Sequence, residues 1–224
     1  MPKRTAECTG LYPMADKKKR RVKEPCTEDD RNALCSVDIS TVPDDLMSNL
    51  CTAVDGLDLS LFKTLTTQWG SGKRLQATFG TNQCEIDSYK FSRLDNVIIV
   101  ASGPMLSLIE HEARRMGVNA NKVIGHVNYY MEGTGAGCGA HQDDEACIDQ
   151  HYPITGYQVG GPATFHVWCG PPGDRRGATA TIHENQRYVM PPGFQLSNWH
   201  AVTRNKVTEK KQWRCNITFR VVCK

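Results

Sequence analysis

Residues 122–130 read KVIGHVNYY, and from here to the C-terminus the chain consists of short apolar or alternating runs. Four later runs share this character: ATFHVW at 163–168, ATATIH at 178–183, RYVM at 187–190 and CNITFRVV at 215–222. Glycine- and proline-rich clusters, such as CGPPGD at 169–174, separate them. Alternation between turn signals is typical of half-buried β-strands. This half of the chain is therefore predicted to be a β-sandwich or jelly-roll barrel.

Two amphipathic helices are predicted before these strands. The first apolar stripe follows Pro43 and comprises Leu46, Leu50, Val54 and Leu57, with Leu59, Phe62 and Leu65 extending it. The second follows Pro104 and comprises Met105, Ile109, Ala113 and Met116, with Gly117 as its stop. Both stripes have helical spacing. The fold class expected is mostly β with flanking helices (α+β), specifically a double-stranded β-helix, or jelly roll.

The 224 residues suffice for one domain. Residues 1–40 are polar and aperiodic, so we expect a disordered basic tail there and a folded domain over 41–224. Residues 1–25 hold eight Lys/Arg against three acids. The tail contains a compact cationic cluster made of Lys17, Lys18, Lys19, Arg20 and Arg21. Such a cluster predicts a nuclear localisation signal or a phosphate-binding arm, although a solvated tail is also consistent with it.

Several classes of protein are disfavoured by the composition. No apolar run reaches membrane-spanning length, and the N-terminus has no apolar stretch typical of a secretory signal. The ten cysteines contain no C-x-x-C pair, which argues against structural zinc and favours reduced thiols. We therefore expect a protein that is not secreted and has no membrane partner. The cationic cluster favours the nucleus, otherwise the cytoplasm, and a monomer is expected.

A candidate metal site begins in the stretch GAHQDDE at 139–145. Residues two apart on a strand point to the same face, so His141 and Asp143 can hold one ion. His200 lies in a later short segment, after a Pro-Pro-Gly turn. Two histidines and one carboxylate form the facial triad of non-haem Fe(II) oxygenases, which leaves open positions on the metal for O2 and a co-substrate.

The C-terminal stretch RCNITFR at 214–220 supplies a partner for an acidic co-substrate. Arg214, Asn216, Thr218 and Arg220 share one strand face, and buried arginines are costly unless they bind an anion. A guanidinium can hold the distal carboxylate of 2-oxoglutarate with two hydrogen bonds. The strand entering the metal loop adds the amide of Asn128 and the phenol of Tyr130 on a shared face.

Together these motifs resemble the AlkB family of Fe(II)/2-oxoglutarate dioxygenases, particularly its DNA-repair members, over about residues 60–222. The resemblance implies that His141, Asp143 and His200 bind Fe(II). It further implies that 2-oxoglutarate is bound by Asn128, Tyr130, Arg214, Asn216 and Arg220. Arg214 would hold the distal carboxylate, and Arg220 would lie near the proximal one.

The resemblance also implies a substrate: an N-alkylated base in nucleic acid, with DNA favoured over RNA. Substrate contacts are expected from Asp144 and Glu145 after the metal loop, and from Phe79, Tyr89 and Phe91 in a nucleotide-recognition lid. Oxidation of 1-methyladenine- or 3-methylcytosine-type lesions would release formaldehyde, succinate and CO2. The segment from Gly80 to Tyr89 is longer than the family's, which keeps a different target open within the same fold. Two alternatives to the demethylase therefore stand beside it. One is an oxygenase of the same fold that hydroxylates a C-methylated base, methylated RNA or a protein side chain, and the other is a non-catalytic nucleic-acid-binding module.

Overall fold

The structure, a computed structural model, describes residues 23–67, 70–91, 94–132, 137–204 and 213–223. Within these residues the strands form two sheets. The larger sheet runs in the order β1 (Asp38–Thr41), β11 (Gln186–Met190), β8 (Ile154–Gly160), β13 (Arg214–Val221), β6 (Val123–Tyr130), β3 (Gly70–Gly80), β5 (Leu94–Val100) and β4 (Ser88–Phe91), with β2 (Lys63–Thr67) beside β3. The smaller runs in the order β10 (Ala178–Ile182), β9 (Ala163–Cys169), β12 (Asn198–Arg204) and β7 (Cys138–His141).

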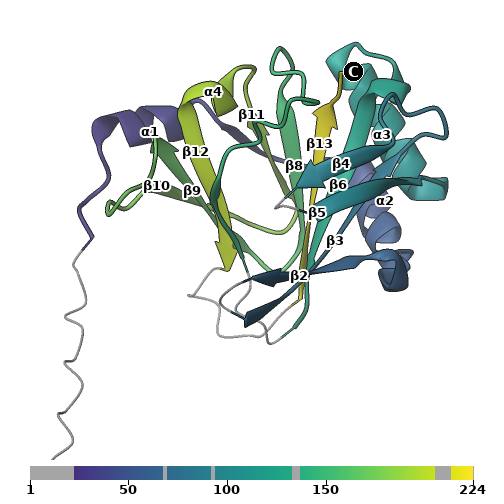
Figure 1. The fold of residues 1–224 in the computed structure, drawn as a ribbon, viewed down its shortest axis with the longest axis horizontal. Helices are drawn as coiled ribbons and strands as arrows, with labels where there is room; N and C mark the ends of the chain where they lie inside the picture. The colour runs from purple at the N-terminus through teal and green to yellow at the C-terminus, as the bar shows by residue number, and fades with distance from the viewer. Residues whose placement is uncertain (1–22, 68–69, 92–93, 133–136, 205–212, 224) are drawn as a thin grey trace, which may run out of the picture.

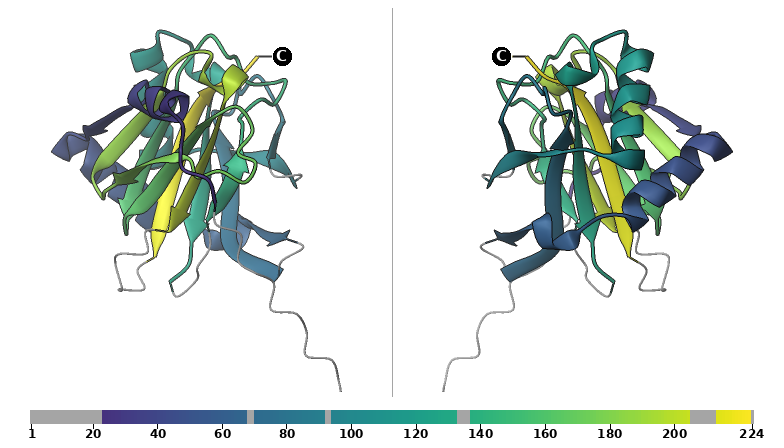
Figure 2. Two further views of the ribbon diagram at one scale, coloured as in Figure 1. Left: turned by 90° about the vertical axis from the view of Figure 1, so that its left-hand side faces the viewer. Right: turned by 90° about the vertical axis from the view of Figure 1, so that its right-hand side faces the viewer.

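The two sheets face each other, and helices cover the outer face of the larger one (Figures 1 and 2). Those helices are α2 (Asp44–Asp55) and α3 (Gly103–Met116), which pack against each other and against the sheet. One apolar core lies between the helices and the larger sheet, and a second lies between the two sheets. The predicted jelly roll with flanking helices is confirmed.

Both long helices begin and end where local chemistry dictates. Helix α2 has Asp44 and Asp45 in its first turn, where carboxylates favour the helix dipole. Helix α3 has a proline in its first turn and ends at Gly117, whose left-handed φ of 71° suits glycine.

The expected continuation of the first helix over residues 59–65 is wrong. A short 3-10 turn, η1 (Leu59–Leu61), and strand β2 stand there instead, because Asp58 caps a new turn through Ser60.

The predicted disorder of residues 1–40 is wrong for the part that the structure describes. Helix α1 (Glu28–Cys35) packs on β9 and β10, and β1 pairs with β11. Thr27 and Asp30 form a reciprocal capping box at the start of α1. The helix has little apolar periodicity, and a partly buried ion pair helps to hold it, as Asp30 contacts Arg175 at 3.1 Å. The cationic cluster at 17–21 lies outside the described residues.

Two remaining short elements are η2 (Ala120–Lys122), which leads into β6, and α4 (Phe194–Ser197), which leads into β12. Helix α4 places Gln195 beneath the loop that follows β7, a position that matters for the site below. None of the described helices has the length and apolar character needed to cross a membrane.

Candidate metal centre

Pairing of β7 with β12 brings the predicted metal ligands together. In this antiparallel pair His141 lies directly opposite His200, and their ring centroids are 4.2 Å apart. Asp143 follows two residues after the end of β7, with Oδ1 3.7 Å from His141 Nε2. The candidate ligand atoms of the three residues all lie within 4.8 Å of one another. Among the described residues no other such cluster of three is found.

The unsatisfied atoms of the triad suit a divalent cation. Asp143 Oδ1 and His200 Nδ1 are buried without a hydrogen-bond partner, although buried polar atoms are otherwise almost always paired. The second oxygen of Asp143 accepts a 2.8 Å hydrogen bond from Arg220, so one oxygen stays available. Two imidazoles and one carboxylate oxygen match the donor set of a non-haem Fe(II) site. The residues therefore fit the predicted metal.

Burial and mutual charge set the protonation of the triad. Burial, reinforced by the neighbouring His141, lowers the pKa of His200 to about 3, so this imidazole is neutral and can bind a metal. Burial opposes charge on His141 as well, but Cys138 and Asp143 raise its pKa to about 9. Burial alone would raise the pKa of Asp143, yet Arg220 and both histidines hold it well below its usual range.

Two glutamines that the sequence did not single out hold the Asp143 loop. Gln195, on α4, accepts a 3.1 Å bond from the Asp143 amide and its carbonyl accepts a 2.7 Å bond from the Gln142 side chain. The Gln150 amide donates to the Asp143 carbonyl at 2.8 Å. These bonds orient a ligand from outside the coordination sphere. Sequence spacing does not predict the contact of Gln195, because Gln195 lies 52 residues from its partner Asp143.

Beside the triad, β13 and β6 present a polar face that points into the space between the sheets. Asn216 lies opposite Asn128, and Arg214 opposite Tyr130, whose ring centroid is 3.5 Å from the guanidinium carbon. Asn216 is fixed by the Tyr188 hydroxyl, which donates to its side-chain oxygen at 3.1 Å. Asn128 Oδ1 is buried with no partner. The polar face is therefore formed without a ligand, and the side-chain oxygen of Asn128 is available to accept a hydrogen bond.

Arg74 is a further member of this region. It lies on β3 opposite Tyr130 and is 2% exposed. Burial opposes its charge, but Cys138 and Tyr130 nearby raise the pKa of Arg74. Its guanidinium carbon is 5.7 Å from the Phe91 ring centroid. No local sequence pattern marks Arg74 as part of this site, because its position depends on the pairing of β3 with β6.

The five predicted substrate residues occupy different environments. Phe91 approaches the site, with its ring 5.6 Å from that of His141, and Tyr89 stacks beside it but is fully buried. Asp144 is exposed and Glu145 half-buried after the metal loop. Phe79 alternates to the opposite face of β3 from Arg74 and packs against Phe62 beneath the helices. The structure therefore does not bring Phe79 to the triad, and contact of the other four with a base stays a prediction.

Comparison with known proteins agrees with this architecture. No family model matches the chain, and a search of curated proteins returns no match. Among solved structures 186 chains match. One, "The structure of OsALKBH1", an AlkB-family dioxygenase, superposes with a TM-score of 0.51 over 83% of this chain and 97% of that one, at 16% identity. The chain has the AlkB-like dioxygenase fold. Within that fold its His-x-Asp…His triad is intact.

Proposed function

We propose that this AlkB-like protein is an Fe(II)/2-oxoglutarate-dependent dioxygenase that demethylates N-alkylated bases in nucleic acid. One observation carries the proposal. In the triad Asp143 and His200 are buried, His141 is half-buried, and two ligand atoms are unpaired. Arg220, which pairs with Asp143, shares strand β13 with a second buried arginine, Arg214. Buried arginines next to a metal site are costly for a merely structural interior and are suited to hold a carboxylate co-substrate.

Each residue has a distinct task in this proposal. His141, Asp143 and His200 would hold Fe(II), which when bound supplies the one-electron chemistry needed to use O2. Arg220 holds one oxygen of Asp143 and leaves the other for the metal. Arg214, 3% exposed and stacked on Tyr130, would bind the distal carboxylate of 2-oxoglutarate, and Asn128 would offer its amide to the same co-substrate.

The nucleic-acid substrate is supported by the fold likeness and by the surroundings of the metal loop. Phe91 lies beside His141, and Asp144 is exposed directly after Asp143. An aromatic ring can stack on an extruded base, and a carboxylate can accept from its exocyclic amine. A methyl group on the pairing edge weakens the duplex, so 1-methyladenine and 3-methylcytosine are cheap to flip out. DNA is the expected polymer.

Mass spectrometry of modified oligonucleotides tests the proposal. The protein, with Fe(II), 2-oxoglutarate and ascorbate, is incubated with strands carrying 1-methyladenine, 3-methylcytosine, 6-methyladenine or 5-methylcytosine, with the Asp143→Ala variant as blank. Loss of a methyl mass from the first two, with matched succinate, is the expected result. A gain of one oxygen on 5-methylcytosine would point to an oxygenase with another target. Consumption of no 2-oxoglutarate with any strand would favour a non-catalytic binding module.

Nuclear location is part of the proposal and depends on the cationic cluster at 17–21. A fluorescent reporter fused to residues 1–40 should accumulate in the nucleus, and replacement of the five basic residues by alanine should abolish this accumulation. A reporter distributed evenly between nucleus and cytoplasm would contradict the proposal.

A further inference from the structure

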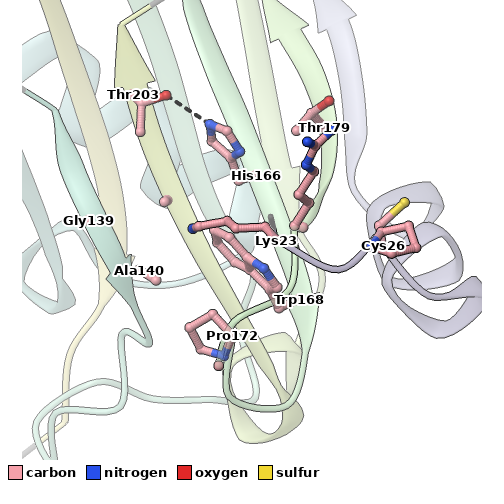
Figure 3. Close-up of a pocket in the computed structure, with 14 residues that line it drawn as sticks. Lys23, Cys26, Gly139, Ala140, His166, Trp168, Pro172, Thr179 and Thr203 are labelled. Atoms are coloured by element: carbon pink, nitrogen blue, oxygen red, sulfur yellow. Dashed lines mark hydrogen bonds between the residues drawn. The ribbon is translucent and has the colours of Figure 1, made fainter. Parts of the chain in front are cut away.

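The smaller sheet has an outer face that takes no part in the metal site. Because side chains alternate along a strand, His200 and Val202 on β12 point inward and Ala201 and Thr203 point outward. On β9 the outward positions are His166 and Trp168. A cavity of about 710 Å³ lies over this outer face, and Figure 3 shows the residues that line it. Its size suits a small organic ligand or one nucleotide.

The cavity has an aromatic wall formed by His166 and Trp168. Their rings are nearly parallel, with an interplanar angle of 11° and centroids 5.8 Å apart. His166 Nε2 lies 2.8 Å from Thr203 Oγ1, which fixes the ring. Burial, with Lys23 nearby, lowers the pKa of His166, so the ring is neutral. Small residues adjoin the wall, among them Gly139, Ala140, Ala201 and Gly177. Gly177 packs on the Trp168 ring, which is 7% exposed, so half-buried His166 offers the more open ring to a flat ligand.

The rim of the cavity is cationic. Lys23 and Arg176 both line it, and no ion pair of either is found among the described residues. The nearby carboxylate of Asp30 is already bound to Arg175. The chain immediately before Lys23 carries the five basic residues at 17–21. Cations beside an aromatic wall complement a ligand that joins a planar ring to an anionic group.

One wall is built by the segment that leads into α1, and backbone hydrogen bonds hold it in place. The Glu24 amide donates to the Asp174 carbonyl at 3.2 Å, and the Arg176 amide donates to the Glu24 carbonyl at 2.8 Å. Lys23, Pro25 and Cys26 therefore line the cavity beside the loop between β9 and β10. The site is preformed, which reduces the ordering cost of binding.

We propose that this outer cavity binds a nucleotide, with its base against His166 at the edge of Trp168 and its phosphate between Lys23 and Arg176. The nucleotide is a unit of a single strand or a free mononucleotide, and the two share the chemistry that the cavity recognises. The inference rests on the proposed function and deepens it. A nucleic-acid strand bound both in this cavity and at the metal site would contact both faces of the smaller sheet. The cavity lies outside the metal site, so its test needs no iron.

Binding to the full-length protein in EDTA tests the cavity. The probes are a fluorescein-labelled, unmodified single-stranded ten-nucleotide DNA, followed by anisotropy, and AMP, followed by calorimetry, with adenosine and inorganic phosphate as partial ligands. Arg176→Glu reverses the rim charge, and Thr179→Trp fills the cavity from an exposed position. Each should raise the dissociation constant about tenfold or more, since the first variant replaces a phosphate-binding cation by a carboxylate and the second occupies the space of the base.

Matched controls are Arg114→Glu, an exposed charge reversal on α3, and Thr181→Trp, which lies on the same strand face as Thr179 but does not line the cavity. Both should bind as the wild type does. Equal affinities in all four variants, or no binding of either AMP or the strand, would overturn the inference. Binding of AMP alone would assign the cavity to a free nucleotide. Failure of the demethylation assay would leave these binding results unchanged, so the two proposals fail separately.

Discussion

At the scale of single residues, Arg220 connects the two halves of the site. It donates to Asp143 at 2.8 Å and to the Thr218 hydroxyl at 2.5 Å, and both partners are buried. Without this cation Asp143 would be a buried carboxylate beside imidazoles alone. The guanidinium therefore keeps the pKa of Asp143 low and its geometry fixed, which a metal ligand requires.

Arg220→Met should weaken Mn(II) or Co(II) binding about 10- to 100-fold at pH 7, as loss of an orienting partner does in other metal sites. Because the pKa of Asp143 then rises, metal affinity should recover partly as pH is raised. Calorimetric titration over pH 6–8.5 measures both effects. Arg114→Met, a change on exposed α3, is the control. A wild-type affinity in the Arg220 variant would show that Asp143 needs no buried partner.

A second residue-scale prediction concerns Gly156, which lies on β8 beneath Tyr188. A Cβ at this position would lie 2.1 Å from Tyr188 Cζ, so no side chain fits. Gly156→Ala should lower the free energy of unfolding by about 3 kcal/mol, at the upper end of overpacking effects. It should also disturb Asn216, which accepts from the Tyr188 hydroxyl.

Urea denaturation followed by circular dichroism measures this destabilisation. Gly139→Ala is the matched control, since a Cβ there meets nothing within 4 Å. If the two variants unfold at the same urea concentration, the close packing of Tyr188 against the β8 backbone does not contribute to the free energy of unfolding.

At the scale of elements, the short helix α1 is held against the smaller sheet by one buried carboxylate, that of Asp30. Asp30 caps the helix with Thr27, accepts from the Cys169 amide at 2.8 Å and pairs with Arg175. Burial opposes ionisation, yet these partners lower the pKa of Asp30 to about 2. The helix therefore belongs to the folded domain, and it positions the segment that walls the outer cavity.

Asp30→Asn should lower the free energy of unfolding by about 2 kcal/mol at pH 7, the energy equivalent of the pKa shift from 3.8 to about 2. The folded-state pKa is depressed, so this stabilisation is complete above about pH 4 and is lost as pH falls towards 2. Chemical denaturation of both proteins at pH 7, 4 and 2.5 measures the difference. Asp29→Asn, exposed in the same helical turn, should be nearly neutral. A pH-independent difference would exclude the ion pair as its cause.

At the scale of the whole molecule, the site connects the two sheets. His141 and His200 come from the smaller sheet, while Arg214 and Arg220 come from β13 in the larger one, and the ion pair of Arg220 with Asp143 crosses between them. A ligand that bridges these groups should therefore stabilise the packing of one sheet on the other. Such stabilisation grows with ligand concentration relative to its dissociation constant.

Mn(II) should raise the melting temperature by roughly 5–10 °C at about 100 times its dissociation constant, and 2-oxoglutarate should add a further increment only when the metal is present. Asp143→Ala should lose both increments. Arg214→Met should keep the metal increment and lose that of 2-oxoglutarate. Differential scanning calorimetry measures each step. Retention of the 2-oxoglutarate increment in Arg214→Met would remove Arg214 from the proposed carboxylate site.

The sequence alone determined the parts of this protein that depend on local spacing. The alternating runs after residue 122 predict the jelly roll, the His-x-Asp spacing marks His141 and Asp143 as a candidate ligand pair, and the period of two puts Arg214 and Arg220 on one face of β13. The tertiary structure alone decided what depends on pairing between distant segments. Four such features join residues that are far apart in the chain. They are the hydrogen bond of Gln195 to the Asp143 loop, the contact of Arg74 with Tyr130, the docking of α1 through Asp30, and the outer cavity. Local patterns carry no information on such contacts, because strand order and register set them.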